Sequence, residues 1–116
     1  GFDLVGEKIT LRADPLVPVA FAGDVAISAA NVTGKVIDFN VMVARNLGAF
    51  DVRVLRKGEQ TRVNPRLTAV FTLGVCEVVL DANTQALGHH HVWIGNGVSQ
   101  VENAGSEPVI VVDLPV

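Results

Sequence analysis

The sequence predicts an all-β protein, an antiparallel sandwich or barrel, on three observations. Apolar and polar residues alternate with a period of two along most of the chain, as in strands that bury one face. Turn residues interrupt the alternation about every 8–12 residues, a spacing typical of sandwiches and barrels. The composition agrees, because 22 valines, 11 glycines and 5 prolines favour strands and turns over helices.

The first part of the chain is predicted to contain five strands. Alternation and turn signals place them at residues 2–5, 8–12, 16–22, 25–31 and 36–44. The first two flank Gly6-Glu7, a hairpin turn of two residues. The third contains Pro18, which confines it to a sheet edge or an extended loop. The last two follow glycine-containing turns.

The remainder is predicted to contain six strands. They lie at residues 50–55, 67–73, 75–80, 90–94, 98–103 and 108–114, with Gly74 and Gly95-Asn96-Gly97 as breaks. The polar stretch 56–66 is interpreted as a solvated loop. Cys76 alternates with Val78 and Leu80, so it is expected to pack inward as a small apolar side chain. Asp51 and Arg53 are expected to form a pair on the solvent side of their strand.

Composition and charge exclude several classes of protein. The 116 residues, 49% hydrophobic and 18% charged, suffice for one folded domain and argue against disorder. A net charge of −3 argues against a nucleic-acid-binding surface. No apolar run approaches the roughly 20 residues of a membrane-spanning helix. We therefore expect neither a nucleic-acid nor a membrane partner.

The closing part of the chain resembles the second sequence motif of the cupins. Asn103, Gly105, Glu107 and Pro108 stand where that motif places Asn, Gly and Glu-Pro. Ser99 stands where the motif has a metal-binding histidine. This departure removes one metal ligand from the set that the resemblance implies.

The three histidines of the chain are consecutive. On a strand, His89 and His91 would share a face with Trp93 and could bind zinc, iron or manganese. A competent site needs at least a third ligand, and neither another histidine nor a nearby glutamate is present. We expect no metal and no cofactor, and interpret the tract as part of a surface strand.

Two stretches of the first half resemble the HutD/Ves family of bacterial proteins. One is Pro18 with Phe21, Gly23 and Asp24, and the other is Gly34 followed by Asp38-Phe39-Asn40 and Met42. HutD proteins are cytoplasmic bicupins associated with histidine utilisation, and they lack an established enzymatic activity. The resemblance implies a cupin-type double-stranded β-sandwich, a cytoplasmic location and a regulatory role in binding a pathway metabolite.

The opening segment of the family, with its Trp-Lys-Asn-Gly-Gly motif, has no counterpart in this sequence. We expect a bicupin fragment: residues 1–45 as the last part of a first cupin half and 46–116 as the second half, together in a single compact unit. Unpaired strand edges would then favour a homodimer, or completion by a missing N-terminal segment.

The predicted strand at 36–44 carries the candidate ligand-binding site. Its apolar face would hold residues 37, 39, 41 and 43, and Asp38, Asn40 and Met42 would lie on the opposite face. This is the pattern of an ordinary half-exposed strand, or of a carboxylate–amide pair that binds a small polar ligand. Arg45, with Lys35 as second choice, would supply a cation, and Phe21 completes the expected site.

Three hypotheses for function remain open at this point. The first is a non-enzymatic protein resembling HutD that senses or buffers a metabolite of the urocanate or formiminoglutamate type. The second is a metal-dependent cupin enzyme, an isomerase or oxygenase, that uses His89 and His91. The third is an interaction module without a ligand. A fold alone does not decide among them.

Overall fold

The structure is a computed structural model that describes residues 1–114 of the chain. Those residues form eleven β-strands and one short 3-10 helix, which confirms the all-β prediction. They divide into two compact units, Gly1–Met42 and Val43–Val116. The assignment of the two parts to cupin halves, and their union in a single compact unit, stay predictions. None of the described helices is long and apolar enough to cross a membrane.

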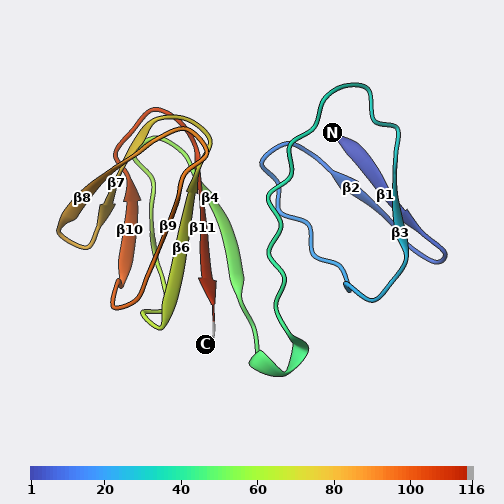
Figure 1. Cartoon of the computed structure of the whole chain (residues 1–116), viewed down its shortest axis with the longest axis horizontal. Coiled ribbons are helices and arrows are strands. Elements are labelled where there is room, and N and C mark those ends of the chain that lie inside the picture. The colour runs from blue at the N-terminus through green and yellow to red at the C-terminus, as the bar shows by residue number, and fades with distance from the viewer. Residues whose placement is uncertain (115–116) are drawn as a thin grey trace. The chain divides into compact units, whose positions relative to one another are not determined.

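The first unit contains one antiparallel sheet of three strands. Its strands are β1 (Phe2–Gly6), β2 (Thr10–Ala13) and β3 (Ile27–Ala30), in the order β2-β1-β3 (Figure 1). The Gly6 amide donates to the Ile9 carbonyl at 2.8 Å and closes the predicted hairpin. The three predicted strands in these regions are therefore confirmed. No residue in 1–42 is buried, so this sheet has no core of its own.

The strand predicted at residues 16–22 is wrong. The Val17 amide donates to the Asp14 carbonyl at 3.2 Å, and Leu16 has a φ of 60°, so the chain turns where the strand would begin. Pro15 and Pro18 lack the amide hydrogen that a sheet ladder requires. The segment is therefore a loop between β2 and β3.

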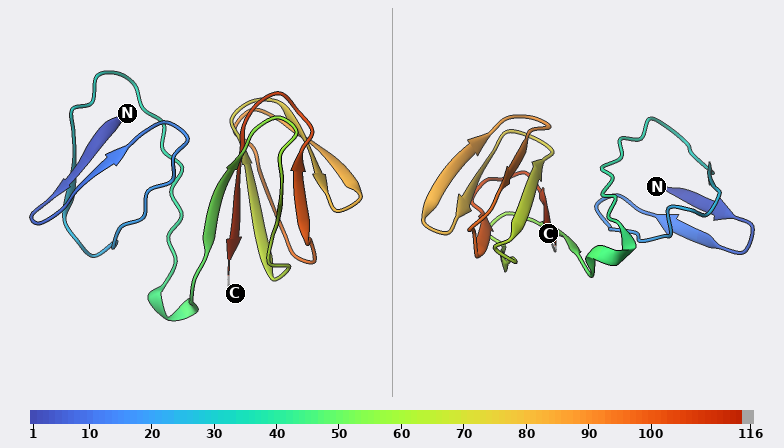
Figure 2. Two further views of the ribbon diagram at one scale, coloured as in Figure 1. Left: turned by 180° about the vertical axis from the view of Figure 1, so that it is seen from behind. Right: turned by 60° about the horizontal axis from the view of Figure 1, so that its bottom comes forward.

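The strand predicted at residues 36–44 is also wrong. This segment runs between β3 and the 3-10 helix η1 (Arg45–Leu47) as a coil without strand arrows (Figure 2). Within residues 1–114 no strand pairs with it. From residue 38 on, its alternation does correspond to burial, since Phe39 and Val41 are half-buried while Asp38, Asn40 and Met42 are exposed. Ile37, expected on the apolar face, is instead 65% exposed. Alternation predicts which side chains are covered, but a strand also needs a partner for its backbone.

The second unit is a sandwich of two four-stranded antiparallel sheets (Figure 1). One sheet has the order β4-β11-β6-β9 and the other β5-β10-β7-β8. The bounds are β4 Asp51–Leu55, β5 Gln60–Arg62, β6 Leu67–Thr72, β7 Cys76–Leu80, β8 Asn83–Leu87, β9 Val92–Gly95, β10 Gln100–Asn103 and β11 Val109–Leu114. Eight strands in this order form a double-sheet jelly roll, an architecture to which cupins belong.

Two strands of the sandwich were not predicted. β5 was interpreted as a polar connection, and β8 lies between the strands predicted at 75–80 and 90–94, where most side chains are polar. Both strands lie at sheet edges, where pairing with β10 and β7 depends on the backbone rather than on an apolar face. The strand predicted at 90–94 begins later, at Val92, so His89–His91 precede it.

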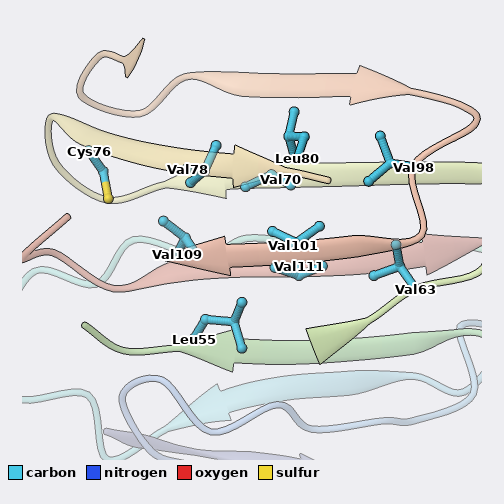
Figure 3. Close-up of a cluster of buried hydrophobic side chains, with 10 residues drawn as sticks. All are labelled: Leu55, Val63, Val70, Cys76, Val78, Leu80, Val98, Val101, Val109 and Val111. Atoms are coloured by element: carbon cyan, nitrogen blue, oxygen red, sulfur yellow. The ribbon is translucent and has the colours of Figure 1, made fainter. Parts of the chain in front are cut away.

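The core lies between the two sheets and consists largely of valines. Val78 and Val101 from one sheet meet Val70 and Val111 from the other, and all four are fully buried (Figure 3). The Cys76 side chain points into the same cluster, which confirms its predicted inward orientation. Burying a valine side chain stabilises a fold by roughly 1.5 kcal/mol or more, so this unit carries most of the hydrophobic stabilisation.

Candidate functional site

The predicted ligand-binding residues lie mainly on the exposed side of the 36–44 coil. Asp38, Asn40 and Met42 are exposed, and the residues between them are half-buried. Alternate residues of an extended chain are about 6.6–7 Å apart, so the Asp38 carboxylate and the Asn40 amide can reach one small molecule. The expected side-chain pattern is therefore present without the expected strand.

The other predicted site residues lie elsewhere. Phe21 is exposed in the loop between β2 and β3, and Lys35 is exposed just before the coil. Arg45 begins helix η1 and belongs to the second unit. The structure thus places Asp38, Asn40 and Met42 in one local group, with Phe21 and Arg45 in separate segments.

The histidine tract forms a turn, and the expectation of a strand face shared by His89 and His91 is wrong. His90 has a φ of 54°, which reverses the chain before β9. The Gly88 amide donates to His91 Nδ1 at 3.0 Å, so this nitrogen already has a partner. The His89 and His90 rings lie 3.8 Å apart, and His90 also stacks on Phe71. Within residues 1–114 no group of three or more His, Cys, Asp or Glu could hold a metal ion.

The cupin-like motif residues form a structural hub around Asn103. The Asn103 side chain donates to the Leu55 carbonyl at 2.9 Å and to the Glu107 carbonyl at 2.7 Å. Its oxygen accepts from the Gly105 amide at 2.9 Å and from the Cys76 thiol at 3.2 Å. Asn103 is fully buried. These contacts hold the turn between β10 and β11, so the motif serves the fold.

Asp81 also holds a turn in place, next to Ser99, the position at which the sequence departs from the cupin motif. Its carboxylate accepts from the Ser99 amide at 3.1 Å and from the Gln100 amide at 3.0 Å. The Ser99 carbonyl accepts from the Val63 amide at 3.0 Å. The backbone of Ser99 is therefore held on both sides, at the position where the motif has a histidine.

A polar cluster at one end of the sandwich contains the predicted Asp51–Arg53 pair and further partners that were not predicted. Arg53 donates to Asp51 at 2.9 Å, to Asp113 at 3.4 Å and to the Arg62 carbonyl at 2.9 Å. The Asn64 amide also donates to Asp113, at 3.1 Å. Two carboxylates thus surround one guanidinium, and the cluster connects β4, β5 and β11.

The expected solvent-side position of Arg53 is wrong. Arg53 is the register partner of Val111, which is fully buried in the core, and register partners share a sheet face. The Arg53 side chain is 30% exposed and Asp113 is 14% exposed. The sequence contained one sign of this inward position. Arg53 and Leu55 are two residues apart, so their side chains lie on the same face of β4, and Leu55 is buried.

A second polar cluster fastens the sheet of the first unit. Asp3 on β1 accepts from Asn31 at 2.6 Å and from Arg12 on β2 at 3.3 Å. Arg12 also donates to Asp14 at 3.0 Å. The hydrogen bonds from Asn31 and Arg12 lower the pKa of the Asp3 carboxyl, and those to Asp14 and Asp3 raise the pKa of the Arg12 guanidinium. Because Asn31 directly follows β3, this cluster joins all three strands.

Comparison with known proteins gives one family. The family model of HutD matches residues 1–110, which is nearly the whole chain. A search of curated proteins finds no match.

Proposed function

The chain belongs to the HutD family, and on this premise we propose that it binds a small polar metabolite of histidine degradation without transforming it. Membership supports a HutD-like role in histidine utilisation. The finer role that we propose is sensing or buffering of the metabolite in the cytoplasm of a bacterium. The observation that carries it is the exposed Asp38–Asn40 pair beside half-buried neighbours.

The two side chains suit a ligand of the urocanate or formiminoglutamate type. A carboxylate accepts hydrogen bonds from an imidazole, amine or formimino N–H, and an amide can both donate and accept. A carboxylate on the ligand would need a cation, for which we propose Lys35, which lies in the same unit as Asp38 and Asn40. Met42 and Phe21 would supply apolar contacts to the carbon skeleton.

The geometry of the histidine turn favours binding over metal-dependent catalysis. The alternative enzyme required His89 and His91 on one strand face, and both residues instead lie before β9. His91 Nδ1 accepts a hydrogen bond from the Gly88 amide, and the His89 ring packs on His90. These contacts give each of the two rings a local structural role.

Calorimetric titration of the chain with urocanate, formiminoglutamate and histidine tests this function. Asp38→Ala and Asn40→Ala should each weaken binding by about 1–3 kcal/mol, because each leaves a ligand group unpaired. The melting temperature should stay nearly unchanged, since both residues are exposed. Glu7→Ala removes an exposed carboxylate in the same unit and should leave binding intact. Binding that is absent, or insensitive to both site substitutions, would contradict the proposal.

A further inference from the structure

We propose that strand β9 is the surface through which two copies of the chain associate, by antiparallel pairing of their β9 edges. β9 is an edge strand whose ladder partner is β6. Beyond that ladder, no backbone group of residues 92–95 has a hydrogen-bond partner within residues 1–114. Such an edge presents a row of donors and acceptors that fits another strand.

β9 differs from the other edge strands of the sandwich. β4 carries Asp51 and Arg53, β5 is only three residues long and contains Arg62, and β8 is mostly polar. Charged residues, short length and polar side chains are the usual means by which proteins prevent edge pairing. The sequence of β9, Val-Trp-Ile-Gly, contains neither a charge nor a proline.

The side chains of β9 also favour association. Val92 is 46% exposed and Ile94 is 64% exposed, whereas Trp93, between them, packs against the core. On β6, the register partners of Ile94 and Val92 are Ala69 and Phe71. Ala69 is buried and Phe71 is half-buried, so Val92 and Ile94 form the exposed apolar part of this edge, and an added strand would cover them.

A second copy of the chain can pair its own β9 with this edge without bringing charged side chains together. A two-fold axis at Trp93 would place Val92 opposite Ile94 of the other copy, so that residues of the same sheet face meet. No Asp, Glu, Lys or Arg of either β9 would enter the pairing, which avoids like-charge contacts between chains that each carry a net charge of −3. Four residues bury less than the roughly 800 Å² per partner of a standard interface, so the dimer should dissociate on dilution.

Analytical ultracentrifugation of the full chain over a concentration series tests this pairing. The wild type should show a reversible monomer–dimer equilibrium. Ile94→Lys should raise the dissociation constant at least about tenfold, since it places like charges at the edge. Val75→Lys is the matched control, because Val75 is 75% exposed but lies in the turn between β6 and β7.

Hydrogen exchange provides a second measurement that needs no substitution. Amides of residues 92–95 should become more protected as the wild-type concentration rises. A chain that stays monomeric at all concentrations would overturn the inference. So would a dimer that Ile94→Lys leaves intact, an added protection confined to another segment, or association only with a different protein.

Discussion

At the scale of single residues, the buried Asn103 side chain forms four hydrogen bonds within the sandwich. Its side chain bonds to Leu55, Glu107, Gly105 and Cys76. Replacement by alanine would remove one hydrogen bond each from the Leu55 carbonyl, the Glu107 carbonyl and the Gly105 amide. A buried polar group that is left unpaired costs about 1–3 kcal/mol. We predict that Asn103→Ala lowers the free energy of unfolding by about 2–4 kcal/mol, measured by urea denaturation.

Gln100→Ala is the control for Asn103. Gln100 lies on the same strand, and its side chain bonds to Gln60 at an exposed position. Its loss should change the free energy of unfolding by no more than about 0.5 kcal/mol. Equal effects of the two substitutions would show that the Asn103 hub is not needed for the fold.

Cys76 gives a prediction for the dependence of stability on pH. Burial raises the pKa of its thiol, because the thiolate is poorly solvated among apolar side chains. A raised pKa in the folded state contributes stability that is present below the unfolded value of about 8.5 and is lost as the pH rises through the folded value. The free energy of unfolding should therefore fall above about pH 8.5 in the wild type, and fall less in Cys76→Ala.

Urea denaturation of both proteins from pH 7 to pH 10 measures this difference. The native thiol should also react slowly with iodoacetamide at pH 7, because it is 3% exposed and protonated. If the free energy of unfolding depended on pH in the same way in both proteins, the prediction that the pKa of the Cys76 thiol is raised would be contradicted.

At the scale of elements, Gly105 shows why the turn between β10 and β11 requires a residue without a side chain. A Cβ at this position would contact the Cys76 sulfur and lie 3.1 Å from the Glu77 amide nitrogen. We predict that Gly105→Ala lowers the free energy of unfolding by about 1–3 kcal/mol. Adding Cys76→Ala should recover part of the loss, since it removes one of the two obstacles.

Gly34→Ala is the matched control for this substitution. A Cβ there would meet no heavy atom within 4 Å, so stability should be nearly unchanged in thermal melts. A comparable loss at both glycines would contradict the close contact as the cause, because the effect of alanine on the unfolded chain favours folding.

Element by element, the sequence predicts a strand well where apolar residues and a backbone partner coincide. β6, β7 and β11 are rich in apolar residues and each pairs on both sides, which is why their predicted positions hold. β8 has a strand partner but no apolar face, whereas residues 36–44 have the apolar alternation but pair with none of the strands within residues 1–114. Periodicity detects burial, whereas backbone pairing depends on residues far away in the chain.

The same distinction applies to the candidate sites. The exposure of Asp38 and Asn40 follows from local alternation and could be predicted. The inward position of Arg53 depends on Asp113, sixty residues later, and on pairing between β4 and β11. The Asp51–Arg53 pair and the buried Leu55 are local signs of part of this cluster. Nothing in the sequence near Arg53 identifies Asp113, so that partner could be found only from the structure.

At the scale of the whole molecule, stabilising contacts are distributed unevenly between the two units. Among the residues that the structure describes, every buried hydrophobic one lies in the range Leu55–Val112. The first unit depends on a three-stranded sheet and the exposed Asp3–Arg12–Asn31 cluster. Exposed ion pairs usually contribute less than about 1 kcal/mol, so they do not replace a core.

This asymmetry predicts that residues 43–116 fold without the first unit, whereas residues 1–42 do not fold alone. The longer piece contains all eight strands of the jelly roll and the buried cluster between its sheets. The shorter piece has no fully buried side chain, and chains of about 40 residues without a core, metal or disulfide are rarely stable. Circular dichroism should show a cooperative melt for residues 43–116 and none for residues 1–42. A cooperative melt of the shorter piece, or an unfolded longer piece, would mean that contacts outside the jelly-roll core govern the stability of the chain.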